Sequence, residues 1–78
     1  MNVEKYNKVF TDLFEVDEIE LKQNFNFGTA KNWDSLAHME LIAQLEDAFD
    51  IIMEADDIMH FGGYENGKKI LLKYGIEI

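Results

Sequence analysis

The segment from Asn32 to Ile52 most constrains what this chain can fold into, because a polar stretch turns there into an amphipathic helix. Asp34 and Ser35 have short side chains whose oxygens accept hydrogen bonds from the free N–H groups of a first helical turn. Apolar residues follow at helical spacing, so we predict a helix from about Ser35 to Phe49. The apolar residues that share its predicted core-facing side are Leu41, Ile42, Leu45, Ala48, Phe49 and Ile52.

The opposite side of the same predicted helix is acidic and contains an apolar spot. Leu36 and Ala43 fall among its carboxylates, and Leu36 directly follows Ser35. A helix face that only meets water does not need a leucine at that place, so we interpret this side as a docking surface with an apolar anchor. The carboxylates of this side belong to Glu40, Asp47 and Asp50, with Glu46 at its edge.

Length and composition predict a single folded domain over residues 1–78. A hydrophobic content of 47%, with six Phe, three Tyr and one Trp, argues against disorder despite a formal net charge of -9. The chain has 16 acidic and 7 basic residues and no Arg. Nucleic acids and anionic membranes need concentrated Lys or Arg, so we expect neither as a partner and favour basic protein partners. Between Lys31 and Lys68 there is no Lys or Arg, so the acidity is concentrated around the predicted helix.

Other sequence signals point to a cytoplasmic, monomeric chain with no chemistry of its own. The N-terminus lacks a cationic segment followed by an apolar run, and no apolar stretch is long enough to span a bilayer. The absence of Cys excludes disulfides and thiolate chemistry, so any thiol must come from a cofactor. Two separated histidines do not have the spacing of a zinc site, and the acidic run from Glu54 to Asp57 lacks the order of a calcium loop.

Ser35 is not predicted to be a hydrolytic nucleophile. The Gly-x-Ser-x-Gly elbow is absent. His38 lies three residues further on, but it falls on the apolar side of the helix, roughly 60° from Ser35. We therefore interpret His38 as a core or edge residue and expect no catalytic group in this chain.

The segments before this helix give a second helix and a long connection. Apolar residues three or four apart predict an amphipathic helix from about Asn2 to Phe14, which Asn2 is able to cap. From Glu15 to Asp34 the periodicity weakens, and loops of this length are usually functional or held by their own side chains. Trp33 is either a lid over the core, which we favour, or a contact for a ligand or partner. The residues predicted to hold the connection are Ile19, Leu21, Phe25, Phe27 and Trp33.

The C-terminal third has weaker signals. Ile51-Ile52-Met53 has strand-like composition but is too short and isolated to predict a strand. Gly62 and Gly63 interrupt the chain, and a last helix is predicted from Tyr64 to Tyr74. Gly67 within it lowers its helix propensity. The residues expected to face inward are Ile70, Leu71 and Tyr74.

A set of residues in this sequence resembles a known family. Asp34-Ser35-Leu36, then Glu40-Leu41 and Leu45-Glu46-Asp47-Ala48-Phe49-Asp50, is similar to the modification site and second helix of acyl carrier proteins. The resemblance covers nearly the whole chain and is specific from Trp33 to about Ile58. It implies an all-α fold: a small acyl-carrier-like four-helix bundle with a long loop between helices 1 and 2 and a short third helix. That third helix corresponds to about Ala55 to Met59, with Ile58 and Phe61 buried, whereas Gly62-Gly63-Tyr64 departs from the family's usual Ser or Thr cap of the last helix.

The resemblance also implies a function. In acyl carrier proteins the serine of this motif receives a 4'-phosphopantetheine arm, whose thiol carries an acyl group as a thioester. Carried over to this chain, Ser35 is the attachment site and Asp34 caps the helix beside the arm. A helix start suits the phosphodiester, because free N–H groups and the helix dipole favour an anion.

The implied partners are enzymes that act on this chain. A phosphopantetheinyl transferase would load the arm and supply the general base and magnesium. Acyl-loading and acyl-using enzymes of fatty-acid, polyketide or related biosynthesis would dock through basic patches. Their docking surface on this chain is expected to consist of Leu36, Glu40, Ala43, Glu46 and Asp47.

Two alternatives stay open at this point. An aminoacyl or peptidyl carrier of a specialised pathway would share the serine and the arm and differ in its loading enzyme. Two residues favour a specialised pathway. Trp33 precedes the motif, and Ala43 stands where primary fatty-acid carriers often have a larger residue. A cofactor-free acidic interaction module would keep the surface without modification of Ser35.

Overall fold

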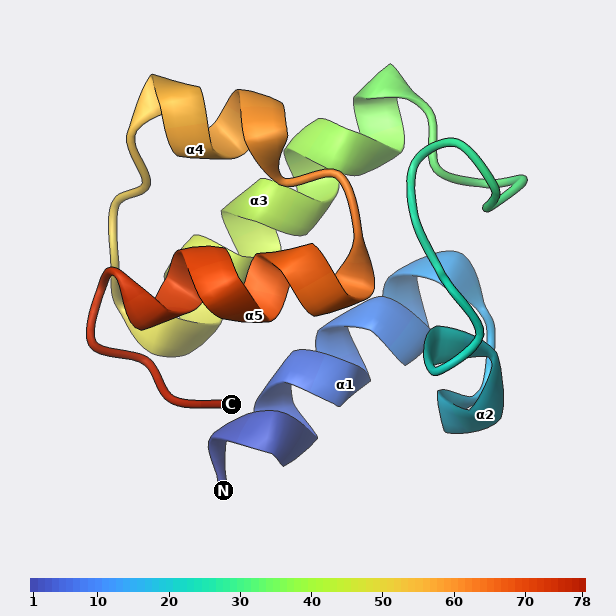
Figure 1. Cartoon of the computed structure of the whole chain (residues 1–78), viewed down its shortest axis with the longest axis horizontal. Coiled ribbons are helices and arrows are strands. Elements are labelled where there is room, and N and C mark those ends of the chain that lie inside the picture. Colours follow the sequence, from blue (N-terminus) through green and yellow to red (C-terminus); the bar gives the residue numbers. More distant parts are fainter.

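The computed structural model describes all 78 residues and shows an all-α chain without strands (Figure 1). None of its helices combines the length and apolar character needed to cross a membrane. The predicted bounds of the first helix and of the helix from Ser35 are confirmed, whereas the last helix ends two residues earlier than predicted. The helices are α1 (Asn2–Phe14), α2 (Glu18–Leu21), α3 (Ser35–Phe49), α4 (Ala55–His60) and α5 (Tyr64–Leu72).

The core is built on an aromatic column along α1. Tyr6, Phe10 and Phe14 lie one turn apart and are fully buried. The Phe10 ring meets Tyr64 of α5 edge-on, with 5.3 Å between centroids, and Phe14 lies 5.1 Å from the ring of Trp33. Aromatic side chains bury large areas, so this column gives a small domain much of its core. The other buried apolar residues are Leu21, Leu41, Ile42, Leu45, Met53, Phe61, Ile70 and Leu71.

Polar contacts within this core join α1 to α5. The Tyr6 hydroxyl donates to the Tyr64 carbonyl at 2.6 Å, and the Tyr64 hydroxyl donates to the Asn7 side-chain oxygen. Burial raises the pKa of both tyrosines, so their hydroxyls stay protonated donors. Gly67 is needed in α5 because a Cβ there would collide with the Phe61 ring and the Tyr6 hydroxyl. The glycine that weakens the helix signal therefore allows α5 to approach α1.

The long connection between α1 and α3 is held by backbone contacts as well as side chains. It contains the single-turn helix α2, which periodicity did not predict, and the Asp17 carboxylate caps α2 by accepting from the Glu20 amide at 3.1 Å. Further along, the Phe27 amide donates to the Gly62 carbonyl at 2.8 Å. This bond ties the connection to the turn before α5.

Several predicted positions are corrected by the structure. The N-cap of α1 is Met1, and Asn2 lies inside the helix. Ile52 is 87% exposed, because α3 ends at Asp50 in a left-handed conformation and the helical spacing does not continue beyond it. Ile19 and Phe27 are exposed, whereas Leu21 and Trp33 are buried and Phe25 is half-buried, so only part of the predicted set faces the core. Ala48, Phe49, Ile58 and Tyr74 are half-buried.

Candidate functional site

Ser35 is the first residue of α3, and its side chain is exposed. Asp34 is the N-cap, as predicted: its carboxylate accepts from the Ala37 amide at 2.8 Å and its carbonyl from the His38 amide at 2.8 Å. The amides of Ser35 and Leu36 have no acceptor within the chain, and the first turn of α3 carries no acidic side chain. An anion on the Ser35 oxygen would therefore meet free N–H donors and the positive end of the helix dipole.

His38 and Trp33 support the first turns of α3 from the inside. The Trp33 Nε1–H donates to His38 Nδ1 at 3.0 Å, and His38 Nε2 lies 2.7 Å from the carbonyl oxygen of Ile58 in α4. Nδ1 must accept and Nε2 must donate, so the two bonds together define one neutral tautomer. Trp33 is 2% exposed, which confirms its predicted place in the core, and His38 is a half-buried bridge, as its position on the apolar side indicated.

A second set of contacts holds α4 to the chain after α5. Asp57 is buried, and its carboxylate accepts from Lys73 Nζ at 2.7 Å and from the Tyr74 hydroxyl at 2.5 Å. These bonds, first that of Lys73 and then that of Tyr74, lower the pKa of Asp57 and raise the pKa of both donors. The Tyr74 oxygen also accepts from the Glu54 amide at 2.9 Å. One carboxylate of the acidic run is thus an ion-pair partner that fixes α4 beside the site.

The predicted docking surface lies mostly on one exposed side of α3. Leu36 is 83% exposed, and Glu40, Ala43 and Asp47 follow it at helical spacing and are exposed too. Glu46 differs from them because it is half-buried and its carboxylate accepts from the Met53 amide at 2.9 Å. The structure therefore brings four of the five residues together and gives Glu46 a role in holding the chain that follows α3.

Two exposed methionines beside this surface were not singled out by the sequence. Met39 lies one turn after Leu36 on α3, and helical spacing alone was enough to place it near that residue. Met59 follows Ile58, whose carbonyl accepts from His38, so it lies where α4 meets α3. The position of Met59 depends on how α4 packs against α3, which a local sequence pattern does not predict. Together with Leu36, Met39 makes the surface around Ser35 more apolar than its charge suggests.

The geometry defines a class of site: an exposed serine at the start of an acidic helix, beside free backbone donors and exposed apolar side chains. Comparisons of the chain with protein-family models, curated protein sequences and solved structures found no match in any of the three.

Proposed function

We propose that this chain is a carrier protein that holds acyl intermediates as thioesters on a 4'-phosphopantetheine arm attached to Ser35. The observation that carries the proposal is the placement of Ser35, exposed at the first position of α3 and next to two amides without acceptors. A phosphodiester on Ser35 would satisfy these donors without rearrangement of the helix. Asp34 would stay the helix cap beside the arm.

The fold is proposed to be a four-helix bundle of the acyl-carrier type. Its helices would be α1, α3, α4 and α5, with α2 as a single turn inside the long connection and α4 as the short third helix. Support comes from the order and lengths of the helices and from the buried column of α1 against α5 and Trp33.

The loading step needs nothing from this chain except the serine. The Ser35 oxygen forms a bond to the phosphorus that carries pantetheine in coenzyme A, and the bond from that phosphorus to the nucleotide part breaks. The hydroxyl proton passes to a base of the phosphopantetheinyl transferase, whose magnesium ion stabilises the leaving phosphate. The thiol of the arm would then attack the carbonyl of an activated acyl donor on a loading enzyme. The donor's leaving group would depart, and the thiol proton would pass to a base of that enzyme. The chain is a substrate and carrier in this scheme, not an enzyme.

The partners of such a carrier would dock on the exposed side of α3. Leu36 offers an apolar anchor, and Glu40 and Asp47 surround it with negative charge. Basic patches on the transferase and on acyl-loading and acyl-using enzymes would be steered toward this surface. We propose that the chain works as a monomer in the cytoplasm, where these enzymes and coenzyme A are found.

Intact mass spectrometry tests the attachment site. The unmodified protein is incubated with coenzyme A, magnesium and a transferase of broad specificity, alongside a Ser35→Ala variant whose folding is confirmed by circular dichroism. The proposal predicts that the wild type gains one phosphopantetheine and that Ser35→Ala gains none. No gain by the folded wild type with an active transferase would favour the cofactor-free interaction module, and modification of Ser35→Ala would place the site elsewhere.

A further inference from the structure

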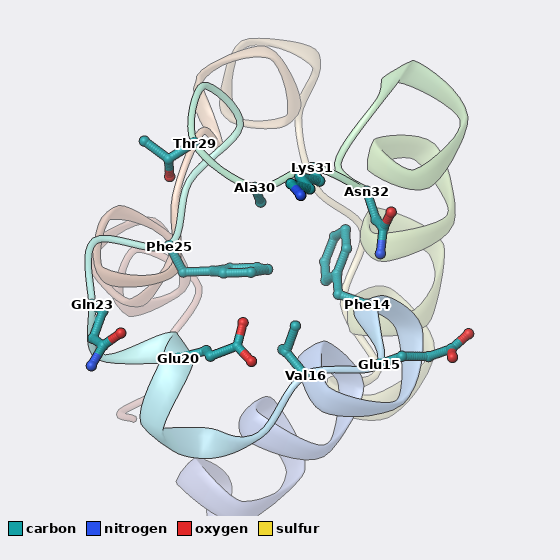
Figure 2. Close-up of a pocket in the computed structure, with 10 residues that line it drawn as sticks. All are labelled: Phe14, Glu15, Val16, Glu20, Gln23, Phe25, Thr29, Ala30, Lys31 and Asn32. Carbon is teal, nitrogen blue, oxygen red and sulfur yellow. The ribbon is translucent and has the colours of Figure 1, made fainter.

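A cavity of about 500 Å³ lies where the end of α1, α2 and the connection to α3 meet (Figure 2). Its apolar lining comes from Phe14, Val16, Phe25 and Ala30. The size falls in the range of small-molecule pockets, which combine an apolar lining with a few placed polar groups. No step of the proposed carrier function uses this space.

The inner wall of the cavity contains two aromatic rings, of which Phe25 is half-buried and offers surface, whereas Phe14 is only 1% exposed. The rings of Phe14 and Phe25 lie 5.3 Å apart at 69°, and Figure 2 shows them on two sides of the opening. Trp33 supports both from behind, with centroid distances of 5.1 Å to Phe14 and 5.7 Å to Phe25. Aromatic faces attract cations and pack against flat apolar groups. This wall therefore suits a ligand that has a cationic group, a flat apolar group, or both.

One carboxylate points into this space. Glu20 reaches from α2 toward the gap between the two phenylalanine rings (Figure 2), and its carboxylate has no hydrogen-bond or ion-pair partner in the chain. Lys31 lies at the opposite side of the opening, whereas the Glu15 side chain points away from it (Figure 2). Glu20 is thus the one carboxylate that points into the cavity, across from Lys31, in a chain of net charge -9.

We propose that this cavity binds a small molecule that carries a primary ammonium group on an aromatic or apolar body. The ammonium group would donate to the Glu20 carboxylate and lie near the Phe25 ring, and the body would cover Phe25 and Val16. An anionic ligand of the same shape would be repelled by Glu20. This inference is independent of any modification of Ser35.

Binding can be followed with the protein's own fluorophore. Trp33 is the only tryptophan and contacts both phenylalanines of the cavity, so its emission should respond to an occupant. The unmodified protein is titrated with phenethylamine and, in parallel, with phenylpropionate, which has a similar body and the opposite charge. Amide chemical shifts of α2 and of residues 14–32 map the contact. We expect phenethylamine to bind at least about tenfold more tightly than phenylpropionate, because only the amine can donate a charge-assisted hydrogen bond to Glu20.

Two matched variants decide whether Glu20 is responsible. Glu20→Gln should weaken phenethylamine binding about tenfold. Glu18→Gln, which changes the charge of the same helix outside the cavity lining, should leave it unchanged. Equal affinity for the amine and the acid, equal effects of the two variants, or no binding of the amine would each overturn the proposal. These outcomes are distinguishable from failure of the carrier proposal, because the protein tested has no arm.

Discussion

His38 is the residue that connects the proposed attachment site to the rest of the molecule. It lies one turn from Ser35, accepts from the buried indole of Trp33 and donates to α4 through Ile58. The Trp33 indole N–H and the Ile58 carbonyl are held in place by the fold, so neither is free to reorient toward solvent. His38 in one tautomer thus joins the first turns of α3 to Trp33 and to α4, in addition to the cap that Asp34 provides.

Replacing this imidazole should therefore cost stability. His38→Ala leaves the buried Trp33 N–H without a partner and removes the bond to the Ile58 carbonyl, which keeps only the Phe61 amide at 3.4 Å. We expect the free energy of unfolding to fall by about 2 kcal/mol. Urea denaturation followed by Trp33 fluorescence measures this change. His60→Ala is the matched control, because the His60 side chain is exposed and its imidazole bonds only to the Asp56 carbonyl of its own helix. Equal losses in the two variants would contradict the bridging role.

Single residues also show which structural roles can be predicted from neighbouring residues in the sequence. Asp34 was predicted as a cap because capping depends on a few adjacent residues, and its bond to Ala37 confirms it. Ile52 was wrongly placed in the core because helical spacing was continued past Asp50, where φ is 55°. The sequence did not predict that the Glu46 carboxylate accepts from the Met53 amide, because Met53 lies seven residues away in the chain that follows α3. Errors arise where the partner lies outside the local pattern.

Among the elements, α4 depends most on distant contacts. It has only six residues, and isolated helices of that length are unstable in water. Its hold on the molecule comes from His38 on one side and from the contacts of Asp57 with Lys73 and Tyr74 on the other. These contacts decide whether α4 stays beside the proposed site.

The Asp57 contact should make stability depend on pH. The folded chain lowers the pKa of Asp57, so its stabilising contribution is present above the ordinary aspartate pKa of about 4 and is lost as the pH falls through the lowered value. The difference in unfolding free energy between wild type and Asp57→Asn should thus be large near neutral pH and shrink in acid. Urea denaturation at several pH values measures it.

The neighbouring carboxylate provides the control for this pH dependence. Asp56 is exposed and its side chain has no partner in the chain, so Asp56→Asn should differ little from wild type at any pH. A difference for Asp57→Asn that stays constant from neutral to acid pH would contradict the assigned cause. The comparison separates the ion pair from the general effect of removing one negative charge.

The elements themselves were predictable to different degrees. α1 and α3 are long and periodic, and their bounds follow from the spacing of apolar residues. α2 has four residues, too few for any period to show, and only Asp17 marks its start. The end of α5 at Leu72 was missed because Tyr74 faces inward through its bond to Asp57 rather than as part of a helix.

The whole molecule carries its charge unevenly. No Lys or Arg lies between Lys31 and Lys68, the stretch that includes α3 and α4, whereas α1 and α5 each carry lysines. Figure 1 shows the two termini near each other, away from the start of α3, and the Asn2 side chain donates to the Glu77 carbonyl at 3.1 Å. The end of the molecule with the proposed site is therefore the acidic one.

This asymmetry predicts salt-dependent loading. Changing Glu40 and Asp47 together to Lys should slow loading by the transferase several-fold at low salt, and by less at high salt, because ions screen long-range attraction. Initial loading rates at two ionic strengths measure the effect. The control changes Glu4 and Glu77 to Lys, which alters the net charge equally near the termini. Equal slowing in both double variants, or slowing that ignores salt, would argue against steering by α3.

The most direct measurement of the central claim is the intact mass of the protein isolated from the cells that make it, before and after treatment with hydroxylamine. The account predicts a phosphopantetheine on Ser35, part of it carrying additional mass that hydroxylamine removes because the cargo is a thioester. The released mass would also distinguish an acyl from an aminoacyl cargo. A protein that is found only without modification at Ser35 in those cells would contradict the account.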